Sequence, residues 1–355
     1  MAVVAQSSLQ TQHGLRSDIE RDTVACLIRT AGEAGVRADP ISIVNFYVAL
    51  KSKPLAILTG PAQHGKIALV QSLAQVLTGG DPLQCQMMVG HAWWAEHSGD
   101  VALFTEAQTR LNTDKIFALI EEALQPENVS RVFIAYLTRI SPAELTDSFS
   151  EVASQLRHGQ IMRLSSIHLT EPIPYPPNLF LIGTMDTARF DTWSDSDLLS
   201  GTTIIQWSAV EAGPAPHRSQ TAAIPGGESE FLRSCIRSEQ AAYLKLQRIL
   251  GWRSQAIWPL LQIGDLLKKH AVQLPGAVMG EAMVYLANAW SKEGDSLFDQ
   301  APSRNLAIAL DLVMTQTLLP RVCGVIRNSA ALRRQLRGAL NGQFPRAVAF
   351  LESLD

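Results

Sequence analysis

The sequence predicts an α/β domain built on a parallel sheet with a phosphate-binding loop, followed by an all-α domain. Short apolar runs typical of buried strands recur through the first 210 residues, with helical patterns between them. A glycine-containing loop that ends in lysine joins the first of these runs to a helix. From Glu230 onward the pattern is helical almost throughout, and strand signals are absent.

The N-terminal part is expected to contain a tail and two helices before the first strand. Residues 1 to 16 are small and polar and predict a loose tail. Ser17 to Glu20 has the spacing of a capping box, which predicts the start of a helix. A second helix over Pro40 to Lys51 leads into a buried strand at Leu55 to Leu58.

The loop after this strand is the main candidate site. Gly60 and Gly65 permit a tight turn and a close approach of the backbone, and the following helix N-terminus offers partial positive charge to an anion. Lys66 adds a full charge for the outer phosphates. Ile67 stands where a phosphate loop has Ser or Thr, so the hydroxyl that binds magnesium is missing. The alternative interpretation is an ordinary glycine turn between strand and helix.

Further strands are predicted at Cys85 to Val89, Arg131 to Leu137, Asn178 to Thr187 and Thr202 to Trp207, with helices over Thr113 to Ala123 and after Pro142. A nucleotide-hydrolysing enzyme needs an acidic pair near the end of the second strand of this set, where one carboxylate organises the metal and the next polarises water. Ala135 and Tyr136 occupy those positions, and Glu144 is the nearest downstream carboxylate.

The chain is therefore divided into a tail and helix (1–40), an α/β phosphate-loop domain (41–210), a linker rich in Pro, Gly, Ala and Ser (211–229) and an all-α domain (230–355). We expect Trp252, Trp258 and Trp290 to fill the core of the last domain. The arginines near the C-terminus give it a basic face, either solvated or in contact with an acidic partner or nucleic acid: Arg327, Arg333, Arg334 and Arg337. Its expected helices are 230–250, 256–270, 279–291, 303–319 and 329–340.

Composition restricts the classes of partner. Of the 355 residues 46% are hydrophobic and 18% are charged, so a large core is easily built, and the formal net charge of −3 argues against a general attraction to nucleic acid. The four cysteines are far apart and lack CxxC spacing, which argues against a zinc site. No leader pattern and no uninterrupted apolar stretch of about 18 residues is present, so we expect a cytoplasmic protein without membrane contact.

The motifs resemble the McrB-type branch of AAA+ NTPases over roughly residues 41 to 340. The resemblance rests on VALKSKPLAILTG (Val48 to Gly60), the strand Val132 to Leu137 and PPNLFLIGTMDTA (Pro176 to Ala188), the last being similar to the strand that carries the first sensor. ALDLVMTQTLLPRVCG (Ala309 to Gly324) looks like the lid helix of one subset of these proteins. The resemblance implies an AAA+-like domain with an all-α lid.

The departures from this family all fall on catalytic positions. Asp186 stands at the sensor asparagine, Ser200 and Gly201 align with the arginine finger, and the lid's sensor arginine falls near Ala277. Together with Ile67 and the Ala135–Tyr136 pair, these changes predict no catalytic residue and no metal ligand. The sequence therefore favours a pseudo-NTPase that assembles with a protein partner, either an AAA+ NTPase or nuclease subunit of a restriction or phage-defence system, or with copies of itself.

Two other functions stay open at this stage. A switch would bind ATP, GTP or ADP at Gly60, Gly65, Lys66 and Ile67 without hydrolysis and without a need for magnesium. A working NTPase would use relocated carboxylates such as Glu144, Asp186 or Asp191. Nucleic acid is expected to be contacted only indirectly or through the basic C-terminal helix.

Overall fold

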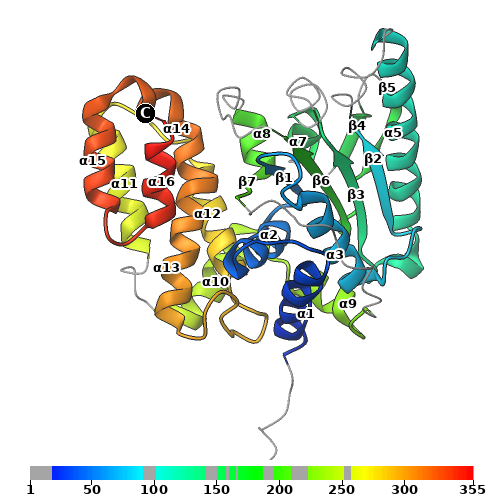
Figure 1. Ribbon diagram of the computed structural model, residues 1–355, viewed down its shortest axis with the longest axis horizontal. Coiled ribbons are helices and arrows are strands. Elements are labelled where there is room, and N and C mark those ends of the chain that lie inside the picture. Colours follow the sequence, from blue (N-terminus) through cyan, green and yellow to red (C-terminus); the bar gives the residue numbers. More distant parts are fainter. Residues whose placement is uncertain are drawn as a thin grey trace, which may run out of the picture.

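The computed structural model describes residues 18–90, 101–140, 150–156, 160–164, 167–186, 196–208, 223–251 and 257–354. A five-stranded parallel sheet flanked by helices forms one side of the molecule, and a group of helices forms the other (Figure 1). This arrangement confirms the α/β class and the helical C-terminal part, and it is compatible with a phosphate-loop domain.

The sheet has the strand order β2-β3-β6-β1-β7, and all four pairings are parallel. Every residue of β1, β3 and β6 is buried, as expected for strands covered by helices on both faces. The five predicted apolar runs all form strands, with these bounds: β1 Leu55–Thr59, β2 Cys85–Val89, β3 Phe133–Thr138, β6 Leu179–Met185 and β7 Thr202–Gln206.

Helices that precede and follow β1 support the loop. Asp18 caps α1 by accepting from the amides of Glu20 and Arg21, so the cap is one residue later than the predicted capping box. Asp39 caps α2, and α3 starts at Lys66 behind Gly65. The predicted helix at Thr113 begins earlier, at Val101. The bounds are α1 Ile19–Glu33, α2 Pro40–Ser52, α3 Lys66–Thr78 and α5 Val101–Ala123.

An antiparallel hairpin outside the main sheet was not predicted. It pairs β4 (Gln160–Leu164) with β5 (Ile167–Pro174). Prolines 172 and 174 fall within β5, where a two-stranded ribbon leaves one edge without ladder hydrogen bonds. The helices α7 (Ser150–Leu156) and α8 (Ser196–Gly201) pack against each other beside this hairpin.

The helical part differs from the predicted pattern at three points. The expected helix over 230–250 is broken between Ser234 and Glu239, where the side chain of Asn288 bonds both backbone groups of Ile236. The expected helix over 303–319 continues through a π-helical turn to Asn328, so Arg327 lies one helix before the other three C-terminal arginines. A last helix was missed; the carboxylate of Asp311 caps it from a distance.

The helices of this part have the following bounds: α9 Gly227–Ser234, α10 Glu239–Leu250, α11 Trp258–Lys269, α12 Ala277–Asn288, α13 Pro302–Val313, η4 Met314–Leu318, α14 Leu319–Asn328, α15 Ala330–Leu340 and α16 Pro345–Glu352. Within the described residues no strand occurs here, as predicted, apart from one isolated bridge between Trp290 and Ser296. α9 begins inside the segment expected to be a linker, and residues 209–222 of that segment lie outside the described chain.

The tryptophan predictions have mixed outcomes. Trp290 is fully buried, as expected for a core residue. Trp258 is 54% exposed, so its assignment to the core is wrong; it begins α11 at the surface, with the described chain interrupted just before Ile257. Trp252 lies outside the described residues. The largest buried side chain in the α/β part is instead Trp207, directly after β7.

A buried lysine joins the helical part to the α/β part. Glu20 of α1 pairs with Lys51 of α2, both fully buried, and Lys51 also donates to the carbonyls of Asn288 and Trp290. The run Pro302–Asn328 is long and apolar enough to cross a membrane, but 67% of its window is buried inside the protein. Burial of this extent is typical of the core helix of a globular protein.

Candidate phosphate-binding site

The loop between β1 and α3 has a backbone that requires glycine at both ends. Gly60 adopts φ +150°, and a Cβ there would lie 2.3 Å from the carbonyl oxygen of Trp207. Gly65 adopts φ +77° and precedes the first residue of α3 without any side-chain cap. The two predicted glycines are therefore fixed by local geometry, and the uncapped helix N-terminus faces the loop.

Trp207 holds the loop from the neighbouring strand and was not recognised in the sequence as a site residue. Its amide donates to the carbonyl of Thr59 at 2.6 Å, and its indole Nε1 donates to the carbonyl of His64 at 2.6 Å. The first contact continues the ladder between β1 and β7, and the second reaches across the loop. Trp207 is 1% exposed, so the loop is clamped between a strand end and a buried ring.

Lys66 is directed onto its own loop. Its ammonium donates to the carbonyls of Gly60 at 2.8 Å and Pro61 at 2.6 Å. The same nitrogen lies 3.0 Å from Oδ1 of Asp186, in a salt bridge where the lysine side chain is only 4% exposed. The three acceptors account for all three ammonium protons. A phosphate at this position would have to displace the carboxylate.

Asp186 follows the last residue of β6 and also faces Arg139, whose Nε lies 3.7 Å from the other carboxylate oxygen. Burial lowers the pKa of Lys66, and Arg139 lowers it further, while the carboxylate of Asp186 opposes both. The site is thus a row of alternating charges, Lys66, Asp186 and Arg139, in which a side chain of the protein supplies the negative charge. The Asp186 side chain is 35% exposed, and the structure brings it to Lys66 as a partner.

The end of β3 carries no carboxylate. Leu137 of β3 pairs with Gly183 of β6, and the next residue of β6, Thr184, pairs with Leu58 of β1. Thr138 and Arg139 therefore lie at the carboxyl end of the sheet, on the same side as the loop. Arg139 has φ +55°, an uncommon conformation for a residue of this type. Its amide is held by the side-chain oxygen of Thr184 at 3.1 Å.

Ala135 and Tyr136, predicted to replace the acidic pair, lie deeper in the strand than the loop. They pair with Leu181 and Ile182, and both are buried. The register therefore places Thr138 and Arg139, and not Ala135 and Tyr136, at the end of β3 beside the loop. None of these residues has a carboxylate. β3 extends one residue beyond its predicted end, to Thr138, and this extension moves the end of the strand away from Ala135 and Tyr136.

Comparison with known protein families finds no match to this chain, and comparison with curated proteins finds none either. The site must therefore be interpreted from its own geometry. Among the described residues, no group of three or more His, Cys, Asp or Glu side chains could hold a metal ion. Glu144 and Asp191 lie outside the described residues, so their distance from Lys66 is not defined.

The other positions that the resemblance assigns to catalysis are Ser200, Gly201 and Ala277, and they lie on helices other than α3. Ser200 and Gly201 end α8, where a Cβ on Gly201 would lie 2.5 Å from Cβ of Ala153, so this position is packed against α7. Ala277 begins α12. Ile67 is half-buried and packs against the core, in keeping with its lack of a polar function.

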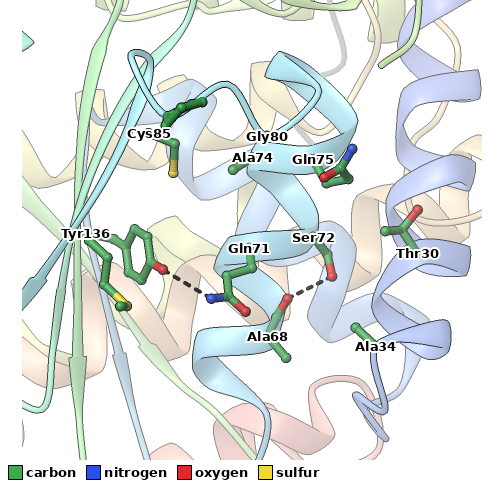
Figure 2. A pocket seen from close by; sticks show the side chains of 12 residues that line it. Thr30, Ala34, Ala68, Gln71, Ser72, Ala74, Gln75, Gly80, Cys85 and Tyr136 are labelled. Carbon is green, nitrogen blue, oxygen red and sulfur yellow. Dashed lines mark hydrogen bonds between the residues drawn. The ribbon is translucent and has the colours of Figure 1, made fainter. Parts of the chain in front are cut away.

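A groove of about 340 Å³ runs beside α3, and it is distinct from the loop. Its lining comes from α1, α3, β2 and β3, and none of the residues 60–67 contributes to it. Figure 2 shows the Tyr136 ring pointing into this groove, where its hydroxyl meets Nε2 of Gln71 at 3.3 Å. Tyr136 thus serves the packing of α3 on the sheet and does not reach the phosphate site.

Proposed function

We propose that this protein is a catalytically inactive, AAA+-like and McrB-related subunit that acts by assembly with partner proteins. The observation that carries the proposal is the occupation of Lys66 by Asp186 and two loop carbonyls. A cation already neutralised by the protein contributes less to phosphate binding, because the carboxylate must be displaced and left near the phosphate.

Loss of chemistry at the sheet edge supports the same proposal. Hydrolysis of a nucleotide needs a metal ligand after the loop lysine, an acidic residue at the edge and a cation that stabilises the transition state. None of Ile67, Thr138 and Arg139 has a carboxylate, Ile67 has no side-chain oxygen, and the Thr138 hydroxyl donates to the carbonyl of Met88 at 3.4 Å. An arginine finger alone accounts for about 10³–10⁵ in rate, so the combined losses leave no useful turnover.

The proposed partner is an AAA+ NTPase or nuclease subunit of a restriction or phage-defence system in the cytoplasm, or further copies of this chain. The resemblance of β6 and of the Leu319-Pro320-Arg321 helix to McrB-type proteins supports this choice. Contact with nucleic acid is then indirect or made through the arginines of α14 and α15. The proposed function does not involve a membrane.

Assembly is tested with the full chain by light scattering after size-exclusion chromatography, alone and with the products of neighbouring genes. We expect a defined complex and no release of phosphate from ATP or GTP by this subunit. A chain that stays monomeric with every neighbour would overturn assembly. Turnover by the pure protein that is lost in Asp186→Ala would instead support the relocated-carboxylate NTPase.

A nucleotide-binding switch without hydrolysis is the second candidate, and the loop amides favour it. Among the described residues, no acceptor is found for the amides of residues 62 to 66, which leaves donors for an anion as in other phosphate loops. Calorimetry with ATP, GTP and ADP, with and without magnesium, tests this function. Binding that Lys66→Ala abolishes would support the switch, and no heat with any of the three would exclude it.

A further inference from the structure

A second cationic concavity lies at the other end of the molecule. It encloses about 460 Å³ between the end of α9, one face of α10 and the turn after α12. Figure 1 shows α9 and α10 at the lower end, opposite α8, which follows the strand that carries the sensor position. Four basic residues and a single acidic one line the concavity: Arg233, Lys245, Arg248, Lys292 and Glu293.

The basic side chains on the rim are available for a ligand. Arg233 is exposed, and its guanidinium has no partner among the described residues. Arg248 is exposed and uses one nitrogen, Nη2, for the carbonyl of Lys292 at 3.2 Å; no partner among the described residues occupies its other donors. Lys292 is 47% exposed, and its nearest carboxylate, Glu230, lies 4.0 Å away. Such a pair is weak and easily rearranged.

The floor of the concavity has an excess of buried positive charge. Lys245 is 8% exposed and donates to the carbonyl of Trp290 at 2.8 Å, the same oxygen that accepts from the buried Lys51 at 3.4 Å. Glu20 pairs with Lys51 and also accepts from the amide of Lys292, whereas among the described residues no ion pair joins Lys245 to a carboxylate. Lys245 therefore lies beside a second buried lysine and has no carboxylate partner of its own in the described part of the chain.

We propose that this concavity is a binding site for a small ligand that carries a phosphate group. A dianion seated among Arg233, Arg248 and Lys292 would balance the unpaired charge of Lys245 behind them. Guanidinium groups form paired hydrogen bonds with phosphate oxygens, and two of them face this space. Ser234, Ile236 and Leu244 complete the lining, and the last two give an apolar surface for the rest of the ligand.

The protonation of Lys245 is the physical link between the ligand and the protein. Burial, and next the neighbouring Lys51, lower the pKa of Lys245 to about 7, against the opposing charges of Glu20 and Asp18. The other charges facing it are Arg248 on its own helix and Lys292 and Glu293 on the turn. A bound anion would favour the protonated amine, so binding should strengthen as the pH falls.

Pyrophosphate and inorganic phosphate are suitable probes, titrated by calorimetry into the full chain. The Lys66→Ala background removes the contribution of the phosphate loop, which keeps the result independent of the proposed pseudo-NTPase function. We expect saturable binding that weakens about tenfold or more in Arg233→Ala and in Arg248→Ala, since each removes a charged hydrogen-bond donor. Arg334→Ala, an exposed arginine on α15, is the matched control and should leave binding unchanged.

A second arm uses sulfate, whose charge stays constant between about pH 6 and about pH 8.5, the range in which the amine titrates. Affinity should fall as pH rises in the parent protein and become independent of pH in Lys245→Met. Lack of saturable binding, equal weakening in all three arginine variants, or an unaltered pH dependence in Lys245→Met would overturn the proposal. The two rim variants keep the test decisive if the methionine variant does not fold.

Discussion

The ammonium of Lys66 and the carboxylate of Asp186 are joined at 3.0 Å across the gap between the loop and the end of β6. The pairing of Thr59 with Met185 in adjacent parallel strands brings them together, because Asp186 directly follows β6 and the loop that leads to Lys66 directly follows β1 at the same end of the sheet. The carboxylate thus occupies a position in which an anionic ligand would contact the lysine. Removing its charge, without changing its shape, tests this interpretation directly.

Asp186→Asn should increase the affinity for ADP and ATP. The amide keeps the size of the carboxylate, removes the competing charge and frees one ammonium proton for the ligand. A charged hydrogen bond contributes about 1.5–3 kcal/mol, so the dissociation constant should fall by about 10- to 100-fold. Calorimetry with and without magnesium measures the change.

Asp265→Asn is the matched control for this substitution, because it removes one negative charge from the exposed face of α11. It should leave nucleotide affinity unaltered. If both variants bind nucleotide as the parent does, the pair at Lys66 does not regulate access to the loop.

Gly60→Ala should destabilise the protein by more than about 3 kcal/mol, because a Cβ would overlap the carbonyl of Trp207 and the backbone conformation is strained for alanine. Gly264→Ala is the comparison: nothing lies within 4 Å of its Cβ, and it sits inside α11. That change should stabilise the fold by about 0.5–1 kcal/mol. Urea denaturation of the two variants gives opposite signs if this account of the loop is correct.

The fold followed from the sequence where burial dominates. Apolar runs such as Leu55–Thr59 and Cys85–Val89 specify buried parallel strands, and their positions were predicted within one or two residues. The break between α9 and α10 was not predictable, because it depends on Asn288, which is 52 positions away from Ile236. The hairpin strand Ile167–Pro174 was missed because its prolines oppose a strand assignment in isolation.

The candidate site was predictable only in part. The glycines and Lys66 were recognised from local spacing, and Asp186 from a motif. The contact between Lys66 and Asp186 depends on which strands are neighbours, and the clamp by Trp207 depends on β7 lying beside β1. The edge role of Arg139 required the register of β3, which sequence spacing alone does not provide.

Stability should increase with pH between about 7 and about 9. The pKa of Lys245 is about 7 in the folded chain and 10.5 as the ordinary value, so in this interval the unfolded chain binds the extra proton. The slope for one such group is at most about 1.4 kcal/mol per pH unit. Above pH 9 the raised pKa of Cys85 acts in the opposite direction, because its folded thiol retains a proton that the unfolded one releases.

Urea denaturation at several pH values, in a buffer without phosphate or sulfate, measures this slope. In Lys245→Met the increase should become smaller by the contribution of this one group. A variant whose stability rises with pH as steeply as the parent would show that another group is responsible.

Glu281 should be the strongest single polar anchor of the helical part. It accepts from Lys53 at 2.6 Å and from Arg321 at 2.7 Å, and both cations also donate to the carbonyl of Leu199 at the end of α8. Glu281→Ala leaves two largely buried cations without their carboxylate, and loss of one partner of a buried pair costs about 3–5 kcal/mol. A double-mutant cycle with Lys53→Met isolates the pairwise energy.

A second cycle, of Asp299→Ala with Arg304→Met, provides the comparison, because Arg304 is 75% exposed and a surface pair contributes at most about 1 kcal/mol. The cycle cancels the separate hydrogen bond that Asp299 accepts from the amide of Ala301. A large coupling at Glu281 would mean that α12 and α14 are fixed to the α/β part by charge. Such fixation opposes movement of a lid over the phosphate loop and so favours assembly over switching. Coupling at Glu281 no larger than the coupling between Asp299 and Arg304 would leave apolar contacts as the main connection, and movement of the helical part would then be the better account.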